Sequence, residues 1–168
     1  VVDQNGEVMS LTATEEEPFL SATLNSDGWL AVTAKAKGVK GRVSVYDTDM
    51  EQVFLFNSSR RFVTDAWVAE KGSAMAAVTL GQENGTFVSN IVLYDMTSET
   101  PSADYNVEDG LVDAIGWTGG KLATVSDTCL TFADTHSSIA GTYSYAGAYL
   151  REYDLDGDGF AAVLLNRY

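Results

Sequence analysis

Hydrophobic and polar residues alternate over short stretches of this chain, and polar turns that contain glycine separate the stretches. Residues 28–47 show the pattern in its simplest form. An apolar run over residues 29–33 is followed by a polar link over 35–41, and alternation resumes over 42–46. Alternation with a period of two among β-branched and aromatic residues is typical of strands, and lysine and glycine supply the turn. The segment therefore predicts a β-hairpin.

This hairpin recurs along the chain. The apolar run that begins at Leu30 returns at Met75, Leu122 and Phe160, at spacings of 45, 47 and 38 residues. Alanine lies beside the large apolar residue in each copy, which suits a strand pressed between neighbouring sheets, where side chains have little room. A polar hairpin precedes each run; these hairpins are residues 25–28, 70–73, 118–121 and 156–159.

Each unit continues with a third strand that ends in aspartate. Asp47, Asp95 and Asp134 close such strands, and Asp3 closes an equivalent run at the start of the chain. An aspartate directly after a strand can bond to its own backbone two residues on and start a turn. Fourth strands are expected after these turns, over residues 8–12, 52–56, 102–106 and 139–145. Four strands per unit of roughly 40–45 residues is the period of a propeller blade, so the sequence predicts an all-β propeller of about four four-stranded blades.

The pattern begins at a third strand and ends after a second strand. Residues 1–12 predict a hairpin around Asn5-Gly6, because both central residues of such a turn need positive φ. Either the two ends pair and form one split blade that closes the ring, or the chain is half of a larger propeller. Residues 1–168 are expected to form one propeller domain or segment, because each unit buries its faces on its neighbours. Open sheet edges would also allow a homodimer.

Charge argues against two classes of partner. The 168 residues include 24 acidic and 10 basic ones, a net charge of −14. Nucleic acid and anionic lipid both require a basic surface, so neither nucleic-acid binding nor membrane contact by this segment is expected. Residues 1–71 carry 11 acidic and 7 basic groups, whereas residues 72–168 carry 13 and 3. We interpret the acidic excess as a solubilising surface.

One short motif carries specific chemistry. Asp154, Asp156 and Asp158 stand at alternate positions with glycine after the last, which copies the front of a calcium-binding loop. The rest of that loop is missing, because Leu165 stands where a bidentate glutamate is needed. Other units fill the same hairpin position without such charge. Two interpretations follow: a structural acidic turn with no cofactor, or a calcium site at the three aspartates.

Aromatic and basic side chains supply the candidate binding residues. Trp29, Trp67 and Trp117 lie near strand ends beside the first hairpins of successive units. Such aromatics can gather on one rim and stack on a sugar or peptide, or they can pack between blades. Arg60 and Arg61 follow a fourth strand and could clamp a carboxylate or phosphate. They could equally form a basic loop tip that nearby acids balance.

The sequence shows no recognisable catalytic constellation. Its one histidine, His136, lies in a turn rich in Ser and Thr, and its one cysteine, Cys129, lies in an apolar strand, where a buried structural role fits. Paired carboxylates could still act together, as in glycoside hydrolysis. We therefore expect a non-enzymatic domain that presents loops for protein or glycan binding, with a carboxylate-based hydrolase or lyase, calcium-dependent or not, as the alternative. The polar segment 81–90 predicts one long loop.

Units that end in Val45-Tyr46-Asp47 and Leu93-Tyr94-Asp95 resemble those of WD-like and quinoprotein-like β-propellers. Segments such as SNIVLYD and REYDLDGDG are most similar to a family of bacterial propellers of unknown function that an N-terminal helix tethers outside the membrane. The Trp-Asp and Gly-His signatures of true WD repeats are absent, so partner rules from that family do not carry over. The resemblance implies an extracellular, cell-surface location and a longer chain whose tethering helix this sequence does not include. The binding or scaffold role is expected from the repeat without a catalytic constellation.

Overall fold

The computed structural model of this chain describes residues 1–2, 5–9, 14, 16–108 and 110–167. Their secondary structure consists of strands and one short 3-10 helix, η1 (Glu70–Gly72). Three antiparallel sheets have four strands each, and a fourth sheet has two. Within the described part of the chain, no helix has the length and apolar character needed to cross a membrane.

Each sheet follows the order of the chain. The first contains β1 (Phe19–Leu24), β2 (Leu30–Ala34), β3 (Gly41–Tyr46) and β4 (Gln52–Ser58). The second contains β5 (Phe62–Val68), β6 (Ala74–Glu83), β7 (Thr86–Asp95) and β8 (Ala103–Asn106). The third contains β9 (Val112–Thr118), β10 (Lys121–Ser126), β11 (Cys129–Ala133) and β12 (Ile139–Ser144). The fourth contains β13 (Tyr149–Leu155) and β14 (Ala161–Asn166).

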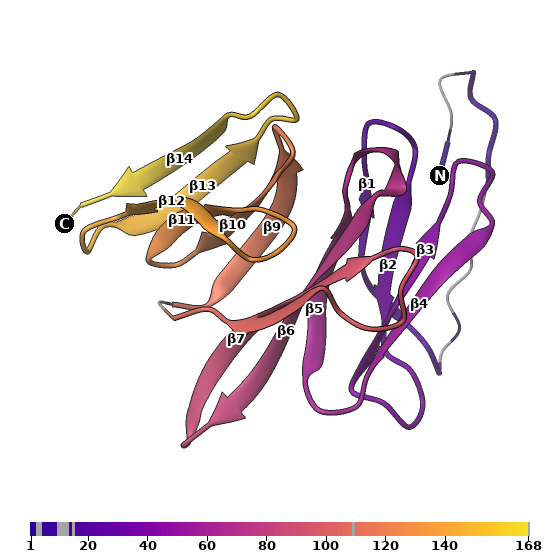
Figure 1. Cartoon of the computed structure of the whole chain (residues 1–168), viewed down its shortest axis with the longest axis horizontal. Helices are drawn as coiled ribbons and strands as arrows, with labels where there is room; N and C mark the ends of the chain where they lie inside the picture. Colours follow the sequence, from indigo (N-terminus) through magenta and orange to yellow (C-terminus); the bar gives the residue numbers. More distant parts are fainter. Residues whose placement is uncertain (3–4, 10–13, 15, 109, 168) are drawn as a thin grey trace.

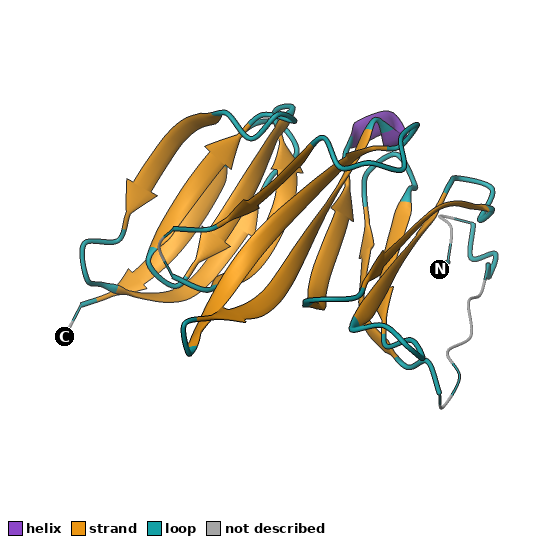
Figure 2. Cartoon of the chain, turned by 60° about the horizontal axis from the view of Figure 1, so that its bottom comes forward, coloured by secondary structure: helices purple, strands orange, loops and turns teal. Residues whose placement is uncertain are grey.

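The sheets stand side by side in an arc, as the blades of a propeller do (Figure 1). The first strands of successive sheets adjoin one another, since β5 contacts β1, β9 contacts β5, and β13 contacts β9. Hairpins between first and second strands, including the one with η1, lie along one rim of the arc, which we call the hairpin rim (Figure 2). The β2–β3 and β4–β5 connections lie along the opposite rim, the loop rim. The arrangement confirms the predicted all-β propeller with a four-strand period.

The repeat predicted the correct first apolar position in the second strands of the first three sheets. In the fourth sheet, the predicted position is one residue too early. Three predicted positions pair with residues at or next to the ends of the first strands: Leu30, Met75 and Leu122. In the fourth sheet this position belongs to Ala161, which pairs with Leu155. Phe160 precedes β14 and is 73% exposed. It belongs to the turn because its carbonyl accepts the N–H of Asp156 at 3.1 Å.

The aspartates that follow the third strands form the predicted turns. Asp47, Asp95 and Asp134 each accept the backbone N–H two residues further on, at 3.0, 2.9 and 2.8 Å respectively. Asp134 also accepts the N–H of Ser138, and these backbone hydrogen bonds lower the pKa of its carboxyl because they favour the charged form. The prediction is confirmed at these three positions, and Asp3 lies outside the described residues.

The core lies between sheets. Three buried clusters fill the three successive interfaces from the first sheet to the fourth. Alanines of the first and second strands are at most 1% exposed in these interfaces: Ala31, Ala66, Ala76, Ala77 and Ala123. Small side chains at these positions let neighbouring sheets approach closely, as the repeat predicted.

The polar segment 81–90 does not form the predicted long loop. β6 continues to Glu83 and β7 begins at Thr86, so that only Asn84 and Gly85 connect them. These two residues have φ values of 50° and 84°, the left-handed conformation that a two-residue hairpin turn requires. The β6–β7 hairpin reaches beyond the third and fourth sheets at the loop rim (Figure 1). An Asn-Gly turn between paired strands therefore replaces the loop that polarity alone suggested.

The ends of the chain lie at opposite ends of the arc (Figure 1). Val2 and Val8 form an antiparallel bridge around Gly6, whose φ is 81°, in agreement with the predicted N-terminal hairpin. Residues 3–4 and 10–12 of that hairpin lie outside the described residues. Among the described strands, β14 pairs only with β13. The described residues therefore form no split blade that would close the ring, and their arc is open.

Candidate functional site

A tight turn brings two arginines to the space between the first and second sheets. β4 ends at Ser58, and β5 begins at Phe62. The Ser58 hydroxyl donates to the carbonyl of Arg61 at 2.6 Å and accepts the Arg61 N–H at 3.2 Å, which closes the turn. The N–H of Lys40 donates to the Ser58 carbonyl at 2.7 Å and joins the turn to the preceding loop. Backbone contacts thus hold the turn that carries Arg60 and Arg61.

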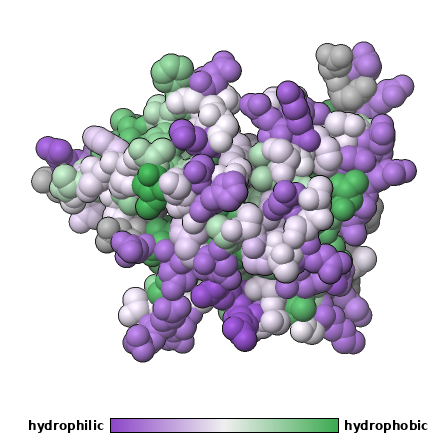
Figure 3. All heavy atoms as spheres, viewed as in Figure 1, coloured by the Kyte–Doolittle hydropathy of each residue, from purple (hydrophilic) through white to green (hydrophobic). Residues whose placement is uncertain are grey.

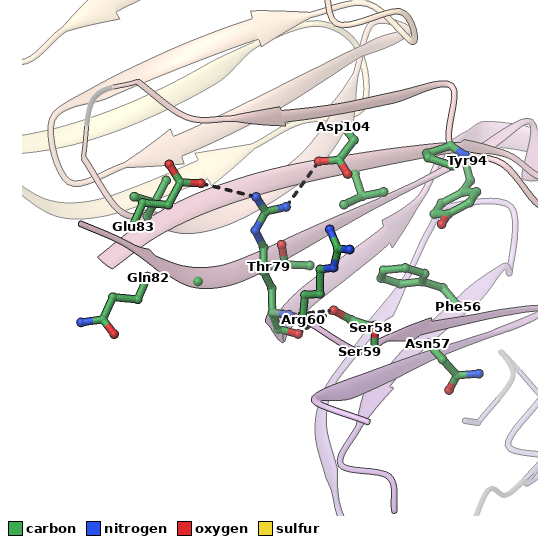
Figure 4. Close-up of a pocket in the computed structure, with 15 residues that line it drawn as sticks. Phe56, Asn57, Ser58, Ser59, Arg60, Thr79, Gln82, Glu83, Tyr94 and Asp104 are labelled. Carbon is green, nitrogen blue, oxygen red and sulfur yellow. Dashed lines mark hydrogen bonds and ion pairs between the residues drawn. The ribbon is translucent and has the colours of Figure 1, made fainter. Parts of the chain in front are cut away.

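Arg61 is surrounded by acceptors from the second sheet. Its Nη2 lies 3.6 Å from Glu83 Oε1, and its Nη1 lies 3.5 Å from Asp104 Oδ1 (Figure 4). Nη2 also donates to Asn106 Oδ1 at 3.3 Å. Gly81 lies beneath the side chain, because a Cβ added there would meet Arg61 Cγ at 3.1 Å. Nearby acids balance Arg61, as one of the two interpretations of the arginine pair expected.

A chain of hydrogen bonds with a buried base holds the acids around Arg61. Asn90 Nδ2 donates to Asp104 Oδ1 at 2.7 Å and to Asn106 Oδ1 at 3.2 Å. Asn106 Nδ2 donates to Glu83 Oε1 at 3.0 Å. The Thr79 hydroxyl donates to Asn90 Oδ1 at 3.1 Å, and both of these residues are 1% exposed. Because the base of this network is shielded from water, its geometry is set before any ligand arrives.

Arg60 lines the same cavity but has a different environment. Its side chain is exposed, and it makes no hydrogen bond or ion pair with the residues that the structure describes. An arginine side chain carries five N–H donors and no acceptor. All five are therefore available to a ligand in this cavity.

Three aromatic rings form the other wall. Phe56 of β4 meets Tyr94 of β7 with ring centroids 5.3 Å apart (Figure 4). Phe54 of β4 meets the same tyrosine at 5.2 Å, and both pairs have tilted geometry. Burial, and then the charge of Asp104, raise the pKa of the Tyr94 hydroxyl. Tyr94 therefore stays protonated at neutral pH and can donate a hydrogen bond.

These walls border a groove beside β4. One cavity of about 360 Å³ lies over the arginines, and a second of about 510 Å³ continues from Phe56 and Tyr94 towards residues 96–99. We call the two cavities together the β4 groove. The first has the size of a small-molecule site, for which about 300–1,000 Å³ is usual.

A related cavity of about 290 Å³ recurs between the second and third sheets. Ser126 takes the position there that Thr79 has in the β4 groove, and Cys129 lines the wall. Glu108 is also part of its lining, but no arginine is. The groove is thus a repeated feature of the fold, and its arginines distinguish the first copy.

The three tryptophans lie half-buried between sheets. Trp29 packs on the first core cluster, and Trp67 and Trp117 pack on the second. Trp117 Nε1 donates to the carbonyl of Trp67 at 3.4 Å. These contacts are those of inter-blade packing, the alternative to ligand stacking. None of the three lines the β4 groove, and their role in ligand binding stays a prediction.

The aspartate motif forms a turn at the hairpin rim. Asp154 lies on β13, and Asp156 accepts the backbone N–H of Asp158. Asn25 forms the same kind of turn in the first sheet, where it accepts the N–H of Asp27 at 3.0 Å. Among the described residues, no three Asp, Glu, His or Cys side chains are grouped as a metal ion requires. Calcium binding at Asp154, Asp156 and Asp158 stays a prediction.

One carboxyl group outside the groove is strongly influenced by burial. Asp65 lies on β5 and accepts a hydrogen bond from the hydroxyl of Ser21 on β1 at 3.0 Å. Ser21 also shares a hydrogen bond of 2.7 Å with Thr33. Burial raises the pKa of Asp65, although the hydrogen bonds oppose that shift. The folded chain therefore disfavours the charged form of Asp65.

We expect Asp65→Asn to stabilise the chain at neutral pH. The raised pKa means that the natural chain has its full stability contribution from Asp65 below the ordinary pKa of 3.8 and loses it as pH rises through the folded-state pKa. Asparagine keeps the acceptor for Ser21 and never ionises. Urea unfolding of both chains across this pH range measures the effect. A difference in stability that does not change with pH would contradict the explanation.

Comparisons with known proteins bear on the fold. Neither a protein-family model nor a curated protein matches the chain. The Dos1 propeller is similar, with a TM-score of 0.67 and 14% identity, over 86% of this chain and 38% of that one. A Bacteroides caccae protein of unknown function has a TM-score of 0.58 and 11% identity, over 95% of this chain and 57% of that one.

A gluconolactonase from Xanthomonas campestris is also similar, with a TM-score of 0.51 and 15% identity, over 88% of this chain and 55% of that one. At such low identities these likenesses show the fold alone, which is that of a β-propeller. The chain spans less than two thirds of the length of each of these structures.

Proposed function

We propose that this chain is a non-enzymatic ligand-binding part of a β-propeller and that its β4 groove binds a glycan. The observation that carries the proposal is the placement of Arg61 between Glu83 and Asp104 at 3.5–3.6 Å. A sugar hydroxyl donates one hydrogen bond and accepts others, so adjacent arginine donors and carboxylate acceptors satisfy it fully. The long ion pairs leave some of these donors and acceptors available.

The composition of the groove supports a glycan over a protein partner. The buried centre of a protein interface is depleted in charged residues. The β4 groove instead concentrates polar and charged side chains around its arginines: Asn57, Ser59, Gln82, Glu83 and Asp104. Phe56 and Tyr94 add an apolar wall against which the carbon face of a sugar ring can pack.

The proposed location is the bacterial cell surface, which the resemblance to tethered propellers implies. A surface location would expose the groove to extracellular glycans. Fractionation of cells that express the tagged full-length protein tests this part of the proposal. Recovery in the cytosolic fraction would overturn the location without affecting the groove.

We expect Asp104→Ala to weaken glycan binding about tenfold or more, because a hydrogen bond to a charged group contributes about 1.5–3 kcal/mol. Glu108→Ala is the matched control, since Glu108 lines the equivalent cavity between the second and third sheets. Calorimetric titration of an oligosaccharide series measures both variants. Equal losses in the two variants would place the ligand elsewhere. Turnover of the sugar would instead favour the carboxylate-based hydrolase.

A further inference from the structure

Basic residues are concentrated in one short part of this acidic chain. Six of its ten lysines and arginines lie within residues 35–61: Lys35, Lys37, Lys40, Arg42, Arg60 and Arg61. Arg42 pairs with Glu17 at 3.0 Å, and Arg61 lies beside Glu83 and Asp104. The other four form no ion pair with a described residue, and their side chains are exposed. We call these four residues the basic rim: Lys35, Lys37, Lys40 and Arg60.

The fold brings the basic rim together at one edge of the first sheet. The lysines lie at or beside the β2–β3 connection, and Arg60 lies in the β4–β5 turn. The two connections meet where Lys40 N–H donates to the Ser58 carbonyl at 2.7 Å. Lys40 Nζ also lies 4.7 Å from the centroid of the Phe62 ring. Figure 3 shows a largely hydrophilic surface along this lower edge of the molecule.

A cavity separate from the β4 groove adjoins the basic rim. It has a volume of about 520 Å³ and is lined by Lys35, Lys40, Phe62 and Thr64, among others. Arg60 lines the β4 groove on the other side of the same turn. Cationic groups therefore continue from this cavity, across the turn, to the groove. A linear ligand that follows them enters the β4 groove beside Arg60.

The charge of the rim selects the chemistry of that ligand. Four like charges without ion-pair partners among the described residues repel one another, and an anionic ligand relieves the repulsion. Large anionic surfaces such as nucleic acid or a lipid bilayer would also meet acidic surface outside the rim, because the net charge of the whole chain is −14. A single polysaccharide chain can follow the rim into the β4 groove without covering the rest of the surface. Arginine binds carboxylates with two parallel hydrogen bonds, which suits a uronic acid unit at Arg60.

We propose that the basic rim binds a carboxylate-bearing polysaccharide whose chain continues into the β4 groove. This inference rests on the proposed glycan-binding function and specifies the class of glycan. The three lysines supply charge attraction outside the groove, and Arg60 binds a carboxylate at its entrance.

The test compares uronate oligosaccharides with their methyl esters, which have the same sugars without the charge. Oligogalacturonates and alginate oligosaccharides, each in both forms, are titrated into the full chain at low and high salt. We expect the acid forms to bind at least about tenfold more tightly than the esters at low salt, and salt to abolish the difference because the rim is exposed.

The variant K35A/K37A/K40A is expected to lose the preference for the acid forms while its affinity for the esters is unchanged. The control K121A/R151A/R167A removes the same charge elsewhere on the chain and should keep the preference. Arg60→Ala should weaken binding of the acid forms as well.

The outcomes separate the two proposals. Equal affinity for acids and esters overturns the basic rim and leaves the glycan groove standing. Binding of the acids alone, unaffected by Asp104→Ala, retains the rim and overturns the groove. Equally tight binding of polyglutamate would identify an acidic protein as the partner and overturn the polysaccharide assignment. No binding of any oligosaccharide by the folded chain overturns both.

Discussion

Gly72→Ala is expected to destabilise the chain by about 2–4 kcal/mol. Gly72 has a φ of 65°, a conformation that side chains disfavour. A Cβ at this position would also overlap the indole ring of Trp29 in the neighbouring sheet. Trp29 packs on the first core cluster and has little freedom to move aside. Backbone strain and steric overlap therefore add together.

Gly38→Ala separates these two causes. Gly38 has a φ of 82°, but no atom lies within 4 Å of the position its Cβ would take. This variant should lose only about 1 kcal/mol, the cost of the left-handed conformation. Urea unfolding followed by far-ultraviolet circular dichroism gives both free energies. Equal losses at the two glycines would show that Trp29 moves freely, and the packing of the hairpin rim would need another description.

Ala76→Leu is expected to cost about 1–3 kcal/mol, because added carbon atoms force shifts in a well-packed core. Ala76 is fully buried between the second and third sheets, in the cluster that contains Ile115 and Leu122. The variant tests whether small residues on the second strands set the distance between sheets.

The fourth sheet provides a matched control for this substitution. Ala162 occupies the position in the fourth sheet that Ala76 occupies in the second sheet, because each pairs with the next-to-last residue of the first strand. The side chain of Ala162, however, is exposed. Ala162→Leu should therefore change stability by no more than about 0.5 kcal/mol. Thermal unfolding of the two variants beside the natural chain makes the comparison. A large loss in both would mean that leucine disturbs the strand itself and that inter-sheet packing is not the cause.

The candidate site was only partly predictable. Arg60 and Arg61 were recognised as a pair. Acids balance Arg61, as one interpretation expected, whereas Arg60 has no partner among the described residues and its role as a clamp stays a prediction. Glu83 and Asp104 were not connected with the arginines. Glu83 fell in a segment interpreted as a loop, and the acids come from β6 and β8, other strands of the sheet whose first strand follows Arg61. Contacts between distant strands depend on pairing and packing that no local pattern contains.

The tryptophans illustrate the same limit. Their positions near strand ends were evident, but a strand-end aromatic can face a ligand or a neighbouring blade. Trp29 contacts the second sheet at Gly72, and Trp117 donates to the carbonyl of Trp67. Only the relative placement of sheets shows these contacts. The apolar run that begins at Phe160 was placed wrongly for a related reason. Its four residues resemble those of the other second strands, but the turn before it extends one residue further.

By itself, the sequence determined the strands, their grouping in fours and the aspartate turns, because alternation and turn chemistry act between residues that are close in the chain. Tertiary structure alone decided that the arc of described strands is open, that Arg61 lies beside acids of β6 and β8, and that four cations share one rim. The physical reason is that hydrogen bonds of turns and hairpins are local, whereas the surroundings of a charged side chain depend on which distant strands lie beside it.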